Sequence, residues 1–329
     1  MILHRKWLSL GLAMLLPACT MTVERDDPVP PAVAAAVATA PMPVDNHSLD
    51  LLNAVLWART SAELRASYLQ AYGQAGKALD AALDPKNRAS WTADVDQRKA
   101  GGFATLPPAI IVDVDETVLD TSDYMLEQIR IGRPYEKPTW NRYVQRRDAP
   151  ALPGALEFLK AVAARGVTVF YISNREVFDE TEQARKPEAE RLYDEDEPTR
   201  VNLAAHGFPN TGDLRTFLFR DAARGWKEKG PRRAEIAKTH RIIMLVGDNL
   251  YDLIDIPGPE QTRASRYGVV EANRAWLGTR WIMLPNPMYG SWETLYTAGM
   301  TQADARRAKL AAIGLADDAD TIIKGGFEP

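Results

Sequence analysis

Two carboxylates two positions apart, Asp113 and Asp115, follow a short apolar stretch of strand-forming residues, 109–112. Such a stretch is typical of a buried strand, and side chains two positions apart on an extended chain point to the same side. Carboxylates held that close repel each other unless a cation or a raised pKa relieves the repulsion, and a hard divalent cation is the simplest relief. Taken alone, the pair is equally compatible with an acidic helix N-terminus, in which Asp, Glu and Thr cap the next helix.

Polar residues of complementary kinds accompany two further predicted strands, 167–172 and 241–246. A hydroxyl and an amide follow the first, two acids follow the second, and a lysine lies in the basic stretch between them. These residues are Ser173, Asn174, Asp248, Asp252 and Lys229. Because ligands bind beyond the carboxyl ends of the strands in an open parallel sheet, the pattern predicts that all of them line one site.

The elements that must position these residues alternate between strands and helices. Strands are predicted over 109–112, 167–172, 214–219, 241–246 and 281–284, and helices over 51–83, 155–165 and 234–239. Alternation of this kind favours a parallel α/β sheet. The segment 85–105 is predicted to be a polar connection, and the acidic run 194–197 a solvated turn.

The first residues of the chain combine a basic segment with a short apolar run, which is typical of a secretory signal. Leu16-Pro17-Ala18-Cys19 resembles the bacterial lipoprotein box, with Cys19 as the lipidated residue, although a simple cleaved signal with an incidental cysteine is the alternative. An Ala- and Pro-rich tether follows. We therefore expect a signal over 1–18, a lipidated tether over 19–46 and a lipid-anchored protein of the cell envelope. Thr20 after the cysteine favours the outer membrane.

The composition indicates a globular chain without a nucleic-acid surface. Hydrophobic residues make up 46% of the 329 residues and charged residues 26%, which excludes extensive disorder. A formal charge of −4 shows no basic excess that would suggest nucleic acid. None of the four histidines stands in an Arg-His-Gly context, which disfavours a histidine phosphatase.

The motifs together resemble the haloacid dehalogenase (HAD) superfamily, and within it the class C acid phosphatases of subfamily IIIB, the bacterial lipoprotein 5'-nucleotidases. The matching segments are 113–120, 172–175, Lys229 with Arg232, 246–252, and 282–286 with Tyr289 and Trp292. The resemblance implies an α/β fold, a Rossmann-like parallel sheet flanked by helices. It also implies a small, mainly helical cap from about 47–106 and 121–150 of a phosphatase domain over 47–329.

The resemblance also implies a role for each acid and for one metal. Asp113 would be the nucleophile that forms an aspartyl phosphate, and Asp115 the acid and base that serves the leaving group and the water. Mg²⁺ would bind to Asp113, to the backbone carbonyl of Asp115 and to Asp248. Asp252 would orient Lys229 or a metal-bound water.

The remaining residues would bind the substrate. Ser173, Asn174 and Lys229 would bind the phosphoryl oxygens, and Trp140 and Tyr289 would hold a flat leaving group such as a nucleobase between them. The expected activity is a Mg²⁺-dependent phosphomonoesterase acting on nucleoside monophosphates and other small monoesters. The expected partners are those substrates and a membrane reached only through the lipid anchor, with a homodimer left open.

Two other classes of function remain as alternatives. A nonenzymatic ligand-binding or storage lipoprotein could use the same fold, but the presence of Asp113 with all its partners argues against a loss of catalytic activity. A glycosyltransferase could use Asp-x-Asp to hold a metal-bound sugar nucleotide, but that leaves Ser173, Lys229 and Asp248 unexplained.

Overall fold

The structure is a computed structural model that describes residues 50–256 and 261–323 of the chain. The chain divides into two units, Met1–Val44 and Asp45–Pro329, and every described residue belongs to the second. The predicted signal, Cys19 and the tether lie outside the described residues. Within the part that is described, no helix is both long and apolar enough to cross a membrane.

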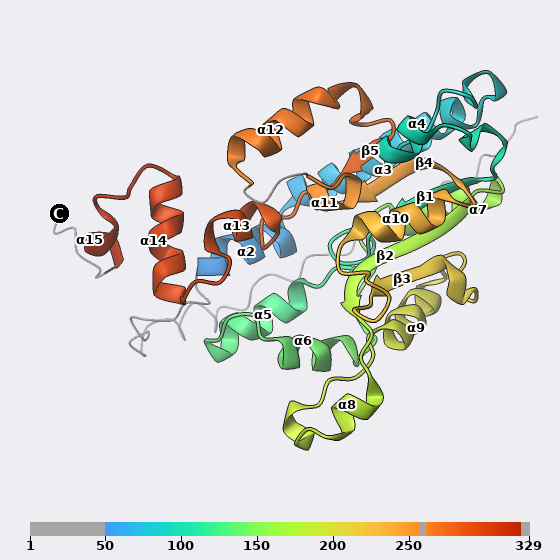
Figure 1. Ribbon diagram of the computed structural model, residues 1–329. Coiled ribbons are helices and arrows are strands. Elements are labelled where there is room, and N and C mark those ends of the chain that lie inside the picture. Colours follow the sequence, from blue (N-terminus) through green and yellow to red (C-terminus); the bar gives the residue numbers. More distant parts are fainter. Residues whose placement is uncertain (1–49, 257–260, 324–329) are drawn as a thin grey trace, which may run out of the picture. The chain divides into compact units, whose positions relative to one another are not determined.

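A parallel five-stranded sheet lies at the centre of the second unit, in the order β3-β2-β1-β4-β5 (Figure 1). The strands are β1 Pro108–Val112, β2 Thr168–Glu176, β3 Phe217–Arg220, β4 Arg241–Gly247 and β5 Trp281–Met283. Strand β1 is central and pairs with both β2 and β4. Since all strands run the same way, the residues that follow these three strands meet at one edge of the sheet.

Helices cover both faces of the sheet (Figure 1). They are α2 Leu52–Thr60, α3 Ala62–Leu83, α4 Val95–Ala100, α5 Ser122–Ile131, α6 Lys137–Val144, α7 Ala155–Ala164, α8 Glu180–Ala184, α9 Asp196–His206, α10 Lys229–Ala237, α11 Leu250–Leu253, α12 Arg263–Ala272, α13 Ser291–Thr297, α14 Gln302–Ala312 and α15 Ala319–Ile323. Helices α3, α7 and α9 bury apolar side chains against one face, and α10 and α11 against the other.

Strand β1 shows how the apolar run builds both cores. Ile110 and Val112 point to the face covered by α3 and α7, while Ala109 and Ile111 point to the opposite face. Each of these four side chains is buried. A strand buried on both faces reads in the sequence as a continuous apolar run rather than an alternating one, which is why the run could be recognised.

The predicted parallel α/β sheet is confirmed, with differences at some boundaries. The third strand begins only at Phe217, because Leu214–Thr216 forms a 3-10 helix capped by the Asp213 side chain. Helix α10 begins at Lys229, five positions before the predicted start. The predicted polar connection 85–105 contains a short helix, α4, whose first turn is capped by Asp94.

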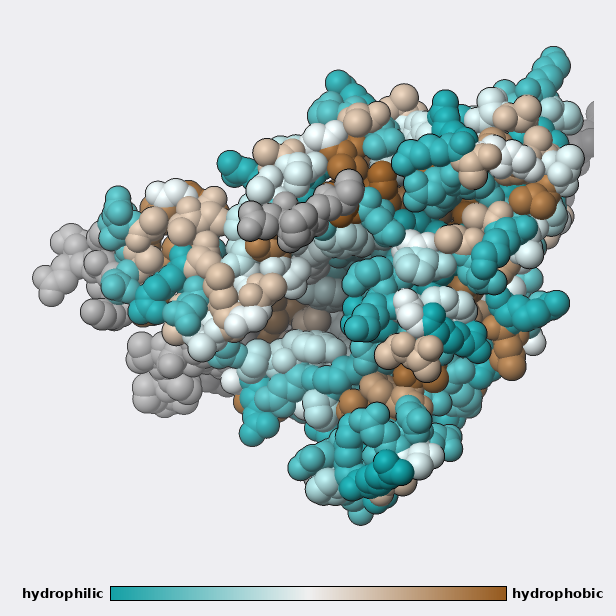
Figure 2. Space-filling view, in the orientation of Figure 1, coloured by the Kyte–Doolittle hydropathy of each residue, from teal (hydrophilic) through white to brown (hydrophobic). Residues whose placement is uncertain are grey.

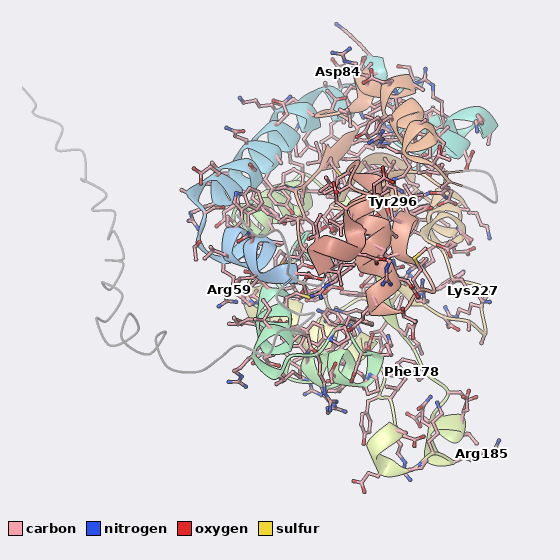
Figure 3. The ribbon with its side chains drawn as sticks, turned by 90° about the vertical axis from the view of Figure 1, so that its left-hand side faces the viewer. Arg59, Asp84, Phe178, Arg185, Lys227 and Tyr296 are labelled. Atoms are coloured by element: carbon pink, nitrogen blue, oxygen red, sulfur yellow. The ribbon has the colours of Figure 1, made fainter. Side chains whose placement is uncertain are left out.

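Two excursions flank the carboxyl ends of the strands. Helices α5 and α6 lie between β1 and α7, and together with α2 they bury a separate aromatic cluster that includes Tyr124, Trp140 and Tyr143. The second excursion, between β2 and α9, carries α8. Figure 3 shows this segment projecting away from the sheet, with Phe178 near its base and Arg185 toward its far end.

Candidate active site

The chain turns sharply just after β1, and the turn carries the acidic motif. Asp113 still belongs to the sheet, because its N–H donates to the carbonyl of Val246 at 3.0 Å. Glu116 then adopts a φ of 50°, a left-handed conformation that is uncommon for a residue with a side chain. Helix α3 holds this turn: the Tyr68 hydroxyl donates to the carbonyl of Glu116 at 2.5 Å, and the Tyr72 hydroxyl to that of Thr117 at 2.6 Å.

Three carboxylates and one ammonium group form the centre of the site. The Lys229 side chain, at the start of α10, donates to Asp113 and forms an ion pair with Asp252 at 2.6 Å. Carboxylate oxygens of Asp113, Asp248 and Asp252 lie within 4.8 Å of one another, so that this set can hold a divalent metal. We call Asp113, Asp248, Asp252 and Lys229 the carboxylate cluster.

Asp248 and Asp252 are positioned by the start of α11. Asn249 caps that helix, and its own backbone N–H donates to Asp252 Oδ2 at 2.8 Å. Asp248 accepts hydrogen bonds from Asn286 Nδ2 at 2.9 Å and from Thr117 Oγ1 at 3.3 Å. Gly247 leaves room for this arrangement, because a Cβ at that position would lie 2.2 Å from Asp252 Oδ2.

The negative charges of the cluster exceed the positive charge that faces them. Burial raises the pKa of Asp113 to about 7, although Lys229 opposes the shift. Loss of hydration, with the charges of Asp252 and Asp113 adding to it, raises the pKa of Asp248 well above its usual value. Burial also disfavours the charge on Lys229, but Asp113 and Asp252 outweigh it, so that the pKa of Lys229 is raised. A cation bound among these carboxylates would relieve their repulsion.

Ser173 and Asn174 lie near the end of β2, beside the cluster. Arg232 of α10 donates to the Ser173 carbonyl at 2.5 Å and to Asn174 Oδ1 at 2.7 Å. The Ser173 hydroxyl accepts from the backbone N–H of Arg175 at 3.1 Å. The buried guanidinium of Arg232 therefore fixes the strand end that carries both residues.

Asp115 lies apart from the three clustered acids and is paired with Arg175. Arg175 Nη2 donates to Asp115 Oδ1 at 2.7 Å, and Arg175 Nε lies 3.1 and 3.3 Å from the two carboxylate oxygens. The sequence alone gives Arg175 no role, although this residue stands directly after Ser173-Asn174 in a matched segment. Thr117 and Asn286, which bond to Asp248, are likewise inside matched segments without an assigned role.

Aromatic side chains cluster beside Arg175, which pairs with Asp115. Trp140 is only 7% exposed, and its ring packs against Tyr124 and Tyr143 and under the guanidinium of Arg175. Tyr289 packs against the same apolar cluster and is partly buried. Tyr135, which the sequence did not single out, is 54% exposed, with its ring centre 6.3 Å from that of Trp140.

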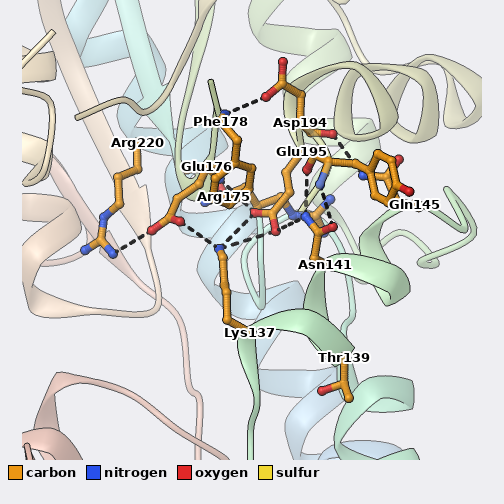
Figure 4. Close-up of polar contacts among 12 residues, drawn as sticks. Lys137, Thr139, Asn141, Gln145, Arg175, Glu176, Phe178, Asp194, Glu195 and Arg220 are labelled. Atoms are coloured by element: carbon orange, nitrogen blue, oxygen red, sulfur yellow. Dashed lines mark hydrogen bonds and ion pairs between the residues drawn. The ribbon is translucent and has the colours of Figure 1, made fainter. Parts of the chain in front are cut away.

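A network of paired charges extends from Arg175 toward the excursion between β2 and α9 (Figure 4). Glu195 accepts from Asn141 Nδ2 at 2.9 Å and from the Glu176 N–H at 2.8 Å. Lys137 lies 3.2 Å from Glu176 and 3.4 Å from Glu195. The predicted solvated turn over 194–197 is therefore wrong for Glu195, whose side chain is fully buried because the insertion carrying Lys137 and Asn141 covers it.

The surface around these residues is largely hydrophilic. Figure 2 shows a hollow in the surface near the carboxyl ends of the central strands, with hydrophilic side chains on much of its rim. A cluster of carboxylates with one lysine, set at the carboxyl edge of a parallel sheet, fits an anionic substrate bound together with a cation.

A model of the HAD superfamily, subfamily IIIB (acid phosphatase), matches residues 29–292. The chain belongs to this family. It is therefore a phosphoric monoester hydrolase, and the nonenzymatic alternative and the glycosyltransferase alternative lose their support. The match begins within the first unit of the chain and ends in α13.

Solved acid phosphatase structures resemble this acid phosphatase along most of its length. The class C acid phosphatase from Bacillus anthracis shares 29% sequence identity with a TM-score of 0.65, covering 81% of this chain and 97% of that chain. A second structure of that enzyme, with tungstate bound, gives a TM-score of 0.64 with the same identity and coverage. The predicted HAD-like fold and the predicted enzyme class are thus confirmed.

Proposed function

We propose that this acid phosphatase hydrolyses small phosphate monoesters through an aspartyl-phosphate intermediate on Asp113. The observation that carries the proposal is the contact of Asp113 with Lys229, which itself lies between Asp113 and Asp252. An ammonium group beside a carboxylate nucleophile reduces its repulsion by the anionic phosphoryl group. The same group then neutralises the phosphoryl oxygens as the new bond forms.

The residues around Asp113 supply the remaining parts of phosphoryl transfer. Asp113 attacks phosphorus while Asp115 protonates the departing oxygen, and Asp115 then takes a proton from the water that cleaves the intermediate. The hydroxyl of Ser173 donates to a phosphoryl oxygen. Since Asn174 Oδ1 is engaged by Arg232, Asn174 offers its amide N–H groups to the same oxygens.

The donor set also fits Mg²⁺. Asp113, Asp248 and the backbone carbonyl of Asp115 would hold the ion, with Asp252 directed to Lys229. Hard oxygen donors, few of them from the protein, suit an ion that retains several waters. When bound, Mg²⁺ neutralises charge on the phosphoryl oxygens. Burial and the neighbouring carboxylates raise the pKa values of Asp113 and Asp248, and a bound cation would offset this cost of their charges, which supports the assignment.

We further propose that the substrates are 5'-nucleotides, with a base held by Trp140 and Tyr289. Because Trp140 is buried, only an edge or one face of its ring could contact the base, whereas the neighbouring Tyr135 exposes more of its surface. The tungstate-bound structure of the similar enzyme supports oxyanion binding in this fold. Attachment to the outer membrane through Cys19, and a homodimer, remain proposals from the sequence.

The decisive assay is phosphate release from a nucleoside monophosphate by wild type and Asp113→Asn, each with and without a chelator. The variant is expected to lose on the order of 10⁴-fold or more in kcat, because it lacks the nucleophile. The chelator should abolish wild-type turnover, and added Mg²⁺ should restore it. Full activity in Asp113→Asn would refute the nucleophile, and chelator-resistant activity would refute the metal.

The anchor has a separate test. Labelling with a fatty-acid precursor in a bacterial host should mark the wild-type chain and not Cys19→Ala. Label that persists in the variant would contradict lipidation at Cys19. Washing the membrane fraction with high salt distinguishes a lipid anchor, which resists the wash, from electrostatic association, which salt screens.

A further inference from the structure

Arg175 holds Asp115 in a defined orientation. Its Nε and Nη2 both donate to Asp115 Oδ1, at 3.1 and 2.7 Å, whereas Oδ2 receives one longer bond of 3.3 Å from Nε. Planar guanidinium and carboxylate groups joined side by side in this way have little freedom to rotate. Oδ2 is therefore the less engaged oxygen of Asp115.

The guanidinium itself is held from several elements. Arg175 Nη1 donates to Thr199 Oγ1 of α9 at 2.9 Å, and the Thr199 hydroxyl in turn donates to the Glu195 carbonyl. A further contact is with Trp140 of α6, whose ring centre lies 5.6 Å from the guanidinium carbon. The Arg175 side chain is only 2% exposed, so water cannot readily replace these partners.

We propose that Arg175 is a positioning residue, which fixes Asp115 so that Oδ2 is directed to the leaving-group oxygen. This inference rests on the proposed function, because it requires Asp115 to act as acid and base. The proton passes from Oδ2 to the leaving oxygen as the P–O bond breaks and the bond from Asp113 to phosphorus forms. In the second step the water oxygen bonds to phosphorus as the bond from phosphorus to Asp113 breaks, and the water proton passes to Asp115, which regenerates the acid. Arg175 keeps its own protons throughout.

The test compares leaving groups that differ in their need for a proton. An alkoxide leaving group must be protonated as it departs, whereas p-nitrophenolate departs without help. We expect Arg175→Lys, which retains charge but loses the planar fork, to lower kcat/KM for nucleoside 5'-phosphates or glycerol phosphate by about 100-fold. For p-nitrophenyl phosphate the loss should stay below about threefold, since general acid catalysis contributes little there.

A matched control is Arg147→Lys, which alters another arginine of the same region. Arg147 pairs with Glu197 of α9 at 2.7 Å on the surface, so this variant should leave both substrates unchanged. Equal losses on both ester classes in Arg175→Lys would overturn the proposal, because they would show a phosphate-binding or purely structural role. No loss on either class would overturn it as well.

A second variant keeps the proposal testable if Arg175→Lys does not fold. Thr199→Val removes the acceptor of Arg175 Nη1 and leaves Asp115 unaltered. This variant should lower kcat/KM for alkyl esters by about 3- to 10-fold and leave kcat/KM for p-nitrophenyl phosphate unchanged. A Thr199→Val enzyme without this difference between the two ester classes would count against a positioning role for Arg175. If wild type hydrolyses no monoester, or Asp113→Asn retains full activity, the proposed function fails irrespective of these variants.

Discussion

The two groups of charged residues beside the sheet differ in how well their charges are matched. In the carboxylate cluster, three acids face the single ammonium group of Lys229. In the adjacent network, which we call the paired network, Asp115, Glu176 and Glu195 face Arg175, Lys137 and Arg220. A matched network can hold a shape by itself, whereas a mismatched one is completed by a ligand. The mismatch therefore supports the proposal that metal and substrate bind at the carboxylate cluster.

Asp248→Asn should separate activity from stability in the carboxylate cluster. The variant loses a carboxylate ligand, so we expect kcat at fixed Mg²⁺ to fall about 10³-fold and the Mg²⁺ concentration for half-activation to rise. Yet the metal-free variant should unfold at a higher temperature than the metal-free wild type at pH 7, because one unmatched buried charge is gone. Equal or lower thermal stability of the metal-free variant would contradict the claim that an unmatched buried carboxylate destabilises the metal-free enzyme.

The pH dependence of stability should differ between the metal-free and metal-bound enzyme. The pKa of Asp113 is raised from 3.8 to about 7, so the folded state holds a proton that the unfolded state releases. The contribution of Asp113 to the stability of the metal-free enzyme should therefore be greatest below pH 4 and fall by a few kcal/mol as the pH rises from 4 to 7. Denaturant titrations from pH 4 to 8 measure this, and saturating Mg²⁺ should flatten the decline. A rise in the free energy of unfolding of the metal-free enzyme over this range would contradict the expected decline.

Glu195→Gln tests the paired network. The change removes the charge opposite Lys137 and replaces one of the two carboxylate oxygens, which accept separately from the Asn141 amide and the Glu176 N–H, so we expect about 2 kcal/mol of destabilisation. The Mg²⁺ requirement should stay unchanged, since Glu195 lies outside the carboxylate cluster. Urea unfolding measures the first and a Mg²⁺ titration of activity the second. A shifted Mg²⁺ requirement would show that the two groups of charges are not separate.

The sequence predicted the sheet well because its signals are local. The strand β1 is a continuous apolar run that ends in acids, and that pattern needs no information from the rest of the chain. The sequence does not predict helix α4, because six residues with little apolar periodicity give no helical signal. Its capping residue, Asp94, is of a type that is equally common in loops. Only the tertiary contacts of that segment decide between the two.

The site was predicted in part. Contacts between residues far apart along the chain could not be predicted. The sequence placed Asp113, Lys229, Asp248 and Asp252 at one edge, and the structure brings them together. It did not show that Arg175 pairs with Asp115, because the two are 60 positions apart and Arg175 gives no pattern of its own. Glu195 was misread for a similar reason: an acidic run looks solvated until the insertion that covers it is known.

The two tyrosines of α3 make the amino-terminal part of the domain a component of the catalytic machinery. Tyr68 and Tyr72 are both buried and hold the carbonyls of the turn that presents Asp113 and Asp115. Proteolysis in the amino-terminal part of the chain would have to occur before Ala62 to leave all of α3, with both tyrosines, in the fragment that carries the site. Helix α3 is also synthesised ahead of β1, so the hydroxyls that fix the turn are present on the nascent chain before the acids emerge.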